Sequence, residues 1–381
     1  MKRFVLFHVL AVSVGVLLFV AACERPGNGP DTTTPTTTTP PAVTTTTTVQ
    51  TDDDRTGLVV EVYVPDKVYP GTTLLGDILN SRVVEVSMEG DILWEYELPE
   101  EYADIGQSAI EAERLDNDNI QALFPGTGIF EISRGGDGNQ DGDIVWSYLN
   151  PKMSHDADRL ADGNVLYVFG SNDQKTDTQV REIDTAGRTV WQWKAWEHYE
   201  QRFGELGTDD GGWAHTNGVQ RLENGTTLIS MRNFYLTSVV DRDGEVAWEY
   251  DWSRFGDDTD PHEPVLLAGG NLLVCLQNDS PYQAVELNPQ TDEIVWTYTH
   301  PTGMRTARDC DRLPNGNTLI VAVRHDGPSS LSYDDDDEST IIEVTPEGEV
   351  VWQLTLKGYP ADRQPGYFYK AERIGAESTR D

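Results

Sequence analysis

Three histidines, His155, His215 and His262, stand at or beside corresponding points of a repeating pattern, and Arg308 occupies the same point in another copy. A neutral imidazole can attack an electrophile or carry a proton near pH 7. A guanidinium group presents a planar fork of N–H donors that fits the oxygens of an anion. Imidazoles gathered with guanidinium groups are therefore suited to binding an anionic group and moving it.

The pattern that aligns these residues is a short strand ending in Leu or Ile, most often preceded by Arg. The residues five positions before each closing Leu or Ile are Ile110, His155, Asn217, His262, Arg308 and Tyr369. His215 lies two residues before Asn217. Such a polar set is not what a packed core selects, and it indicates a site. The alternative is a wet channel mouth that tolerates polar residues without function.

A second repeated feature, Gly-x-x-x-Trp or a close variant, shows which elements position these residues. Its six tryptophans are Trp94, Trp146, Trp191, Trp248, Trp296 and Trp352. Between them, alternating apolar and polar residues with Asn-Gly or Asp-Gly turns predict four short antiparallel strands per unit. In the third unit these are residues 155–160, 164–169, 178–183 and 188–193. A helix is expected only at 195–204.

Four-stranded units that repeat about every 45 residues are typical of β-propeller blades. The sequence therefore predicts an all-β fold, a six-bladed β-propeller of four-stranded antiparallel blades, over residues 57–376. Residues 69–74 resemble a second strand without a first, and residues 369–374 a first strand without a second. The C-terminal strand is therefore expected to close the ring. Residues 57–64 are either an extra edge strand or a lead-in.

The N-terminal region predicts export and lipid anchoring. Residues 1–22 have the basic start and apolar run of a signal peptide, and Val20-Ala-Ala-Cys23 resembles a lipobox, so Cys23 is the expected lipidation site. A simple signal anchor is the alternative. Residues 23–56 are rich in Thr and Pro and predict a disordered stalk, while 377–381 form a tail. We expect a cell-surface or periplasmic protein that contacts the membrane through its N-terminal lipid only.

The charge balance narrows the class of partner. The chain has 65 acidic and 28 basic residues in 381, a formal net charge of -37. Nucleic-acid binding needs a basic face, so nucleic acid is not an expected partner. Abundant Asp and Glu with few Lys is typical of halophilic proteins, whose surface charges are screened by salt. An ordinary acidic secreted protein is the alternative.

Two further features are the cysteines at 275 and 310 and the acidic segment at 137–143. Cys275 and Cys310 lie in apolar strand patterns, which favours two free buried thiols over a disulfide. A weak calcium candidate, with the spacing of a calcium loop, consists of Asp137, Asn139, Asp141 and Asp143. Tyr148 stands where a bidentate Glu is expected, and a tight hairpin turn explains the same residues without an ion.

Three motifs carry a family resemblance: Trp213-Ala-His-Thr-Asn217, Ser230-Met-Arg232 and the segment 262–271, His-Glu-Pro-Val-Leu-Leu-Ala-Gly-Gly-Asn. With the blade pattern, they resemble bacterial and archaeal arylsulfotransferases of the aryl-sulfate sulfotransferase type. The resemblance covers roughly residues 57–376. It implies a six-bladed propeller that moves a sulfuryl group from a phenolic sulfate ester to another phenol through a sulfated histidine, without a cofactor or metal.

The resemblance also implies roles for individual residues. His262 matches the histidine that becomes sulfated. His215, Asn217 and Arg232 match the residues that hold the sulfate oxygens, and His155 matches a further channel histidine. Arg308, from its place in the repeat, is a second cation for the substrate. The N-terminal β-sandwich of some family members is absent here.

Two insertions precede site residues in the chain, at 196–212 and 357–366. They predict either a lid with an aromatic wall for a phenol or small local cores. The aromatic residues concerned are Trp196, Tyr199, Phe203, Trp213, Tyr367 and Phe368.

The alternative to a sulfotransferase is a non-catalytic binding propeller at the cell surface. A quinone-dependent dehydrogenase shares the Gly-x-x-x-Trp repeat but usually needs eight blades, so six copies disfavour it. The sequence leaves open the sulfuryl donor, the acceptor and the oligomeric state.

Overall fold

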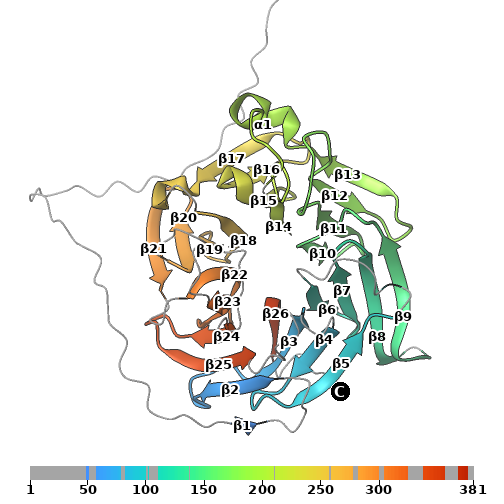
Figure 1. Cartoon of the computed structure of the whole chain (residues 1–381), viewed down its shortest axis with the longest axis vertical. Coiled ribbons are helices and arrows are strands. Elements are labelled where there is room, and N and C mark those ends of the chain that lie inside the picture. The colour runs from blue at the N-terminus through green and yellow to red at the C-terminus, as the bar shows by residue number, and fades with distance from the viewer. Residues whose placement is uncertain are drawn as a thin grey trace, which may run out of the picture. The chain divides into compact units, whose positions relative to one another are not determined.

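The structure is a computed structural model that describes residues 57–78, 82–99, 102, 110–136, 138–209, 211–256, 259–277, 282–299, 304–324, 338–356 and 368–375, with the backbone of 49–50. The predicted signal peptide, Cys23, most of the predicted stalk, Asp137, the insertion at 357–366 and the predicted tail lie outside these residues. Six antiparallel sheets stand around a common axis (Figure 1). The predicted six-bladed propeller is confirmed.

Each blade has four strands in sequence order from the axis outward, and the first blade takes its inner strand from the C-terminus. The sheet of blade 6 carries two further strands on its outer edge. Blade 1 contains β26 (Phe368–Gly375), β3 (Gly71–Asp77), β4 (Arg82–Val86) and β5 (Ile92–Glu97). Blade 2 contains β6 (Glu111–Arg114), β7 (Ile120–Phe124), β8 (Gly128–Gly136) and β9 (Asn139–Leu149). Blade 3 contains β10 (Ala157–Arg159), β11 (Val165–Val168), β12 (Val180–Ile183) and β13 (Thr189–Trp193).

The other three blades repeat this plan. Blade 4 contains β14 (Thr216–Arg221), β15 (Thr227–Met231), β16 (Leu236–Val240) and β17 (Val246–Asp251). Blade 5 contains β18 (Pro261–Leu266), β19 (Leu272–Leu276), β20 (Ala284–Asn288) and β21 (Glu293–Tyr298). Blade 6 contains β22 (Met304–Arg312), β23 (Thr318–Arg324), β24 (Glu338–Val344) and β25 (Val350–Leu356).

The ring closes as predicted, by pairing of the C-terminal strand β26 with β3 in a register that places Gly375 opposite Gly71. The structure also shows which of the two expected roles residues 57–64 have. Strand β2 (Leu58–Tyr63) pairs with β25 and forms an extra outer strand of blade 6. Its inward residues Leu58, Val60 and Val62 are buried, which explains its alternating pattern. A short strand β1 (Val49–Gln50), within the expected stalk, pairs with β2.

The repeated tryptophans lie at the junctions between blades. Their indole N–H groups donate to the next blade over 2.8–3.0 Å, from Trp94 to Asp141, Trp146 to Thr185, Trp191 to Arg242, Trp296 to Pro346 and Trp352 to Met88. The repeated Arg of the next blade stacks on the same indole. These cation–π pairs are Arg159 on Trp146, Arg221 on Trp191, Arg312 on Trp296 and Arg373 on Trp352.

The same arginines also form ion pairs with a glutamate that lies opposite the Trp in its own blade. The pairs are Arg159–Glu131, Arg221–Glu182, Arg312–Glu286 and Arg373–Glu343. The junction between blades 4 and 5 differs, because Val239 lies opposite Trp248 and Leu266 replaces the Arg. Both are packed against one apolar cluster there. At this junction, both members of the Arg–Glu ion pair are thus replaced by apolar residues.

Outside the blades, the described residues form one α-helix, α1 (Trp196–Phe203), within the expected range, and two short 3-10 helices, η2 (Arg232–Phe234) and η3 (Trp252–Phe255). No helix in the described part of the chain is long and apolar enough to cross a membrane. Cys275 and Cys310 are both free and buried, which agrees with the preferred prediction.

Candidate active site

The predicted histidines converge with Tyr369 at one end of the inner strands. The ring centroids of His155 and His215 are 4.7 Å apart, and those of His155 and His262 are 6.3 Å apart. Tyr369 lies 5.5 Å from both His155 and His262. All four side chains are buried, with 6% or less of their surface exposed. The residues come from blades 3, 4, 5 and 1, so the ring itself assembles the cluster.

Irregular backbone at the start of the inner strands turns these side chains inward. His155 and His215 adopt left-handed conformations with φ of 75° and 49°, and Glu263, next to His262, has φ of 42°. Such angles are unfavourable for residues other than Gly and often mark functional sites. The pairing register also shifts between His262 and Val265 and between Phe368 and Ala371. A bulge lets consecutive side chains, such as His262 and Glu263, both face the axis.

A chain of hydrogen bonds assigns the tautomers of His155 and His215. Gly211 O is only an acceptor, so His215 Nδ1–H must donate to it over 2.9 Å. A neutral His215 then accepts at Nε2 from His155 Nε2–H, 3.0 Å away. His155 Nδ1 in turn accepts from Ser154 Oγ–H over 2.7 Å, while Ser154 Oγ accepts from the backbone N–H of Gly170 and Ser171. Every member of this chain is satisfied with both rings neutral.

His262 is bound differently. Its Nε2 lies 3.2 Å from the Tyr369 hydroxyl, and its Nδ1 is buried without a hydrogen-bond partner among the described residues. Neither ring nitrogen is held by a backbone group. One nitrogen of the neutral ring therefore keeps a lone pair that is available to an incoming electrophile.

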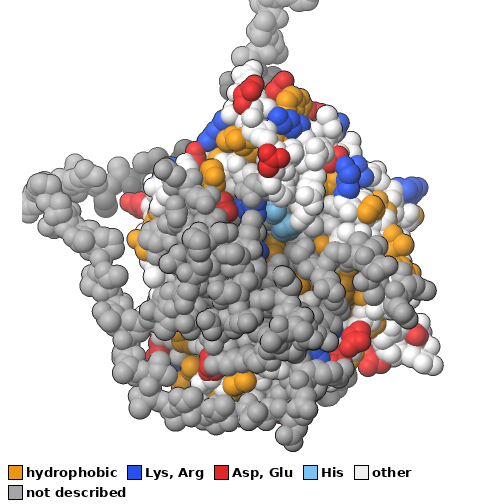
Figure 2. Space-filling view, in the orientation of Figure 1, with side chains coloured by type: hydrophobic (Ala, Val, Ile, Leu, Met, Phe, Trp, Pro, Cys, Tyr) orange, Lys and Arg blue, Asp and Glu red, His pale blue; other side chains and the backbone are white. Residues whose placement is uncertain are grey.

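Two arginines belong to the same neighbourhood. The backbone N–H groups of Arg232 and Asn233 donate to His215 O and Ala214 O, which binds η2 to the loop that carries His215. Arg308 Cζ lies 5.6 Å from the centre of the Tyr369 ring. Figure 2 shows histidine atoms near the middle of one face with Lys or Arg atoms beside them. The predicted cations are thus adjacent to the histidines.

Asn217 contacts the backbone beside His262. Its Nδ2 donates over 3.0 Å to the carbonyl of Pro261, the residue before His262, and its Oδ1 is buried without a hydrogen-bond partner in the described part of the chain. Ser230 Oγ donates to the same carbonyl over 3.1 Å. In this structure Asn217 therefore helps to fix the backbone beside His262.

Burial and nearby cations keep the three imidazoles neutral. Burial lowers the pKa of His155, and the charges of Arg232 and Arg308 lower it further. Burial likewise lowers the pKa of His215, with His155 and Arg232 contributing. The pKa of His262 is lowered by burial and then by Arg308. All three pKa values fall well below 6.5. A neutral His262 is a nucleophile, and the arginines remain to attract an anion.

The residues that follow the aligned site residues in the chain form a cluster of buried charged side chains, which we call the charged layer. This layer was not predicted from the sequence. Lys370 Nζ lies 2.6 Å from Glu111 Oε1, 2.6 Å from Asp156 Oδ1 and 3.2 Å from Glu263 Oε1. A signal was present, because the residue after each aligned position is charged in five of the six copies: Glu111, Asp156, Glu263, Asp309 and Lys370. Strict strand alternation hid it by predicting opposite faces for neighbouring residues.

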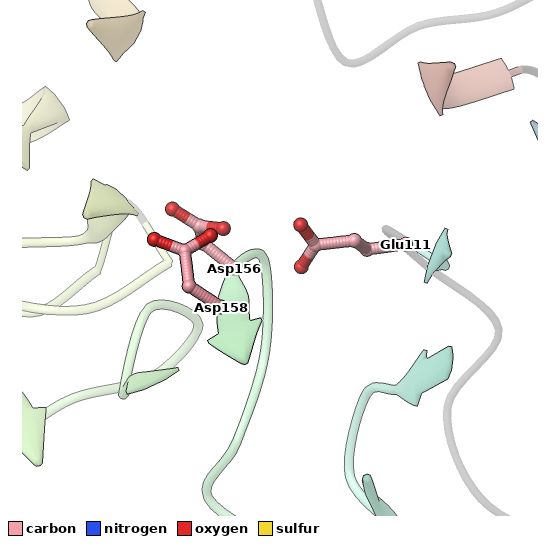
Figure 3. Close-up of side chains that lie close together, drawn as sticks. All are labelled: Glu111, Asp156 and Asp158. Atoms are coloured by element: carbon pink, nitrogen blue, oxygen red, sulfur yellow. The ribbon is translucent and has the colours of Figure 1, made fainter. Parts of the chain in front are cut away.

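Carboxylates of this layer also make the one arrangement of described residues that resembles a metal site. Glu111, Asp156 and Asp158 bring oxygens within 4.8 Å of one another, and Figure 3 shows Glu111 pointing toward the two aspartates. The ammonium group of Lys370, however, contacts both Glu111 and Asp156. That internal cation supplies the charge balance that a metal ion would otherwise provide.

The weak calcium candidate shows other contacts. Its described members lie on the hairpin between β8 and β9, where Asp141 Oδ1 accepts from the Trp94 indole and Asp143 Oδ2 accepts from Gln140 N. Turn and junction contacts therefore account for them.

The described part of the first insertion forms a small local core and not an aromatic wall. Phe203 stacks on Phe234 at 4.2 Å, and Trp213 meets the same ring edge-on at 4.9 Å. Trp213 is fully buried and donates its indole N–H to Phe203 O. Tyr199 is also buried. This core supports the loop that ends in His215. Phe368 is fully buried too, while Tyr367 lies outside the described residues.

Comparison with a solved structure supports this fold. Among solved structures, a protein of unknown function from Bacteroides caccae is similar, with a TM-score of 0.54 and 17% identity over 79% of this chain and 99% of that one. Virginiamycin B lyase from Staphylococcus aureus has a TM-score of 0.41 and 16% identity over 66% of this chain and 71% of that one. The search of curated proteins gave no match.

The model of the arylsulfotransferase (ASST) family matches residues 71–248 and 232–359, which together span all six blades and more than half of the chain. This range includes the three clustered histidines and both arginines. Family membership supports arylsulfotransferase activity in general. The chain belongs to the arylsulfotransferase family.

Proposed function

We propose that this protein is an exported, lipid-anchored arylsulfotransferase that moves a sulfuryl group from an aryl sulfate ester to a phenol through a sulfohistidine at His262. The observation that carries the proposal is the buried cluster of three neutral imidazoles beside two guanidinium groups. The scheme uses side chains of this chain alone.

Binding comes first. The sulfate ester carries one negative charge, and Arg232 and Arg308 attract it, each with a fork of donors for its oxygens. The bound anion offsets the positive charges that lower the histidine pKa values. The pKa of the His155–His215 pair therefore rises when substrate binds, and the pair gains the ability to hold a proton.

In the first transfer, the lone pair of His262 attacks the sulfur as the bond from sulfur to the phenolic oxygen breaks. The sulfuryl group ends on the His262 ring, and the phenolate leaves with the electron pair of the broken bond. The released phenolate leaves the site as an anion and takes a proton from solvent where the pH lies below the pKa of that phenol. Sulfuryl transfer resembles phosphoryl transfer, with charge spread over peripheral oxygens, so positioning and electrostatics dominate the catalysis.

The second transfer reverses the first with another phenol. The His155–His215 pair takes the proton of the acceptor hydroxyl, and the acceptor oxygen attacks the sulfur. His262 leaves as a neutral ring, and the product is the acceptor sulfate ester. The pair then passes the acceptor's proton to solvent and returns to its neutral state. Atoms and charge balance over the two steps, because this proton offsets the charge of the phenolate released in the first transfer.

The test uses the chain without residues 1–22, purified in high salt, with 4-nitrophenyl sulfate as donor and phenol as acceptor. Release of 4-nitrophenolate should depend on phenol, and mass spectrometry after donor alone should find a sulfuryl adduct on His262. H262A should abolish both signals. The matched control is H198A, because His198 lies on α1, stacked on Trp193, and outside the cluster.

Turnover by H262A at the wild-type rate would contradict the sulfohistidine. A folded wild-type protein that gives neither turnover nor adduct with several aryl sulfates would favour the non-catalytic binding propeller instead.

The export proposal rests on the N-terminal sequence alone, Val20-Ala-Ala-Cys23 after an apolar run. Metabolic labelling with a radioactive fatty acid should label the wild-type protein and not C23S. The labelled protein should sediment with membranes, and C23S should be released. Equal labelling of both would exclude Cys23 as the lipidation site.

A further inference from the structure

Lys370 connects the residues that follow the site residues in the chain. Its ammonium group contacts Asp156, which follows His155, Glu263, which follows His262, and Glu111. Lys370 itself follows Tyr369. One buried cation therefore joins blade 1 to the inner edges of blades 2, 3 and 5, one residue away from the reactive side chains.

We propose that Lys370 is a positioning residue that sets the placement of His155 and His262 from beneath. The inference rests on the proposed function for its kinetic readouts only. His155 and Glu263 adopt unfavourable left-handed backbone angles, which persist only where the surroundings fix them. Lys370 supplies such fixation by a hydrogen bond to Asp156 beside His155 and by a charge contact of 3.2 Å with Glu263 beside His262.

Other contacts of the layer make the arrangement rigid. Asp156 Oδ2 also accepts from Val219 N, and Glu111 Oε2 accepts from Ala157 N over 2.7 Å. Each carboxylate thus holds Lys370 with one oxygen and the backbone of the next inner strand with the other. Without the ammonium group, Glu111 Oε1 and Asp156 Oδ1 would both lose their hydrogen bond to Lys370.

The charge of Lys370 is secure in this environment. Burial alone lowers the pKa of Lys370, but Asp156, Glu111, Glu263 and Asp309 together raise it well above its usual value. Its charge also reaches the site, where it lowers the pKa of His155 and His262. Arg232 and Arg308 act on these histidines in the same direction. Removing Lys370 therefore has a second, electrostatic signature beside the loss of position.

The experiment compares K370M with a matched control, R159M. Arg159 also lies on an inner strand and also pairs with a carboxylate, Glu131, but it faces a blade junction. We expect K370M to lower kcat for 4-nitrophenyl sulfate at least tenfold and to change KM less than threefold. The acidic limb of kcat/KM should move to higher pH, because the histidines lose a nearby positive charge. R159M should lower Tm but keep kcat within twofold and the limb in place.

Two further measurements keep the outcome decisive. If K370M does not fold, the variant K370M/E111Q/D156N/E263Q takes its place. In this variant the three carboxylates that Lys370 contacts are replaced by neutral amides, so no negative charge is left without its partner. Wild-type kcat in that variant would overturn the proposal, because Lys370 would then act only by balancing charge. Wild-type kcat and an unmoved acidic limb in folded K370M would overturn it as well.

Histidine NMR in the absence of substrate separates this proposal from the proposed function. The resonance of the His155 Nε2–H that is shared with His215 should shift in K370M and not in R159M. If the wild-type protein transfers no sulfuryl group, the proposed function fails, and this shift still decides whether Lys370 positions the histidines. An unchanged resonance in K370M would overturn the positioning role.

Discussion

At the scale of single residues, the histidine cluster is set apart by its low pKa values. Burial and then Arg308 lower the pKa of His262 well below 6.5. The neutral ring, which is the nucleophile, is thus the main form above that lowered value. We expect kcat/KM to stay constant from neutral pH down to below pH 6.5 and to fall only in more acidic solution. An acidic limb centred at or above pH 6.5 would contradict this assignment.

The variant R308M provides a second test of the pH assignment. Loss of the Arg308 charge should raise the pKa of His262 and move the acidic limb upward, because Arg308 is the largest cause after burial. The same variant should raise KM for the anionic donor. Measurement of kcat/KM from pH 4 to pH 9 at constant ionic strength would show both effects.

Asp173 is the residue that holds the His215 loop. Its carboxylate accepts from His215 N over 3.1 Å, from Ala214 N over 3.2 Å and from Gln179 Nε2 over 2.9 Å. The D173A substitution leaves two buried backbone N–H groups without these partners, at a cost of about 1–3 kcal/mol each. We expect kcat to fall by at least tenfold.

The check for Asp173 is a comparison of kcat with thermal unfolding. The surface ion pair of Lys67 and Glu349 provides the control, and E349A should leave both quantities nearly unchanged. A D173A protein with wild-type kcat would show that the carboxylate is not needed to hold His215.

At the scale of elements, each blade junction is built from side chains at corresponding positions of the two blades that meet there. In blades 5 and 6 the set is Asn271 and Glu286 with Arg312, where Asn271 Nδ2 donates to Glu286 over 2.7 Å and Arg312 pairs with Glu286 over 2.8 Å. At the junction of blades 4 and 5 the equivalent residues are Thr226, Val239 and Leu266. A charged set and an apolar set are thus two solutions to the same packing problem.

This substitution pattern predicts strong coupling at the junction. R312L alone should destabilise the fold by about 2 kcal/mol, because Glu286 keeps a half-buried charge without its partner. The triple variant N271T/E286V/R312L copies the other junction and should recover most of that loss. Urea unfolding of the single and triple variants gives the coupling free energy. Additive losses in the triple variant would contradict the idea of two equivalent sets.

At the scale of the whole molecule, the net charge of -37 governs how the protein responds to salt. Like charges repel across the surface at low ionic strength, and the screening length shrinks to about 3 Å at 1 M salt. We expect Tm to rise and KM for an aryl sulfate to fall between 0.1 M and 2 M KCl. A neutral sugar at matched osmolarity is the control, and a flat response to KCl would show that surface repulsion is unimportant.

The repeat by itself determined the blade number, the closure by the C-terminal strand and the alignment of His155, His262 and Arg308. It could do so because one period recurs through the chain, and equivalent positions in a closed ring must lie at the same end of the axis. The resemblance to the arylsulfotransferase family then implied that Arg232 and His215 lie in the same neighbourhood.

Tertiary structure alone decided the rest. Bulges and left-handed residues turn both His262 and Glu263 toward the axis, and no alternation rule predicts that pair of directions. The meeting of Lys370 with three carboxylates depends on strands up to 259 residues apart in the chain. The tautomers of His155 and His215 depend on Gly211 O and Ser154 Oγ. Local pattern fixes which residues share a layer, but contacts across the ring fix what each one does there.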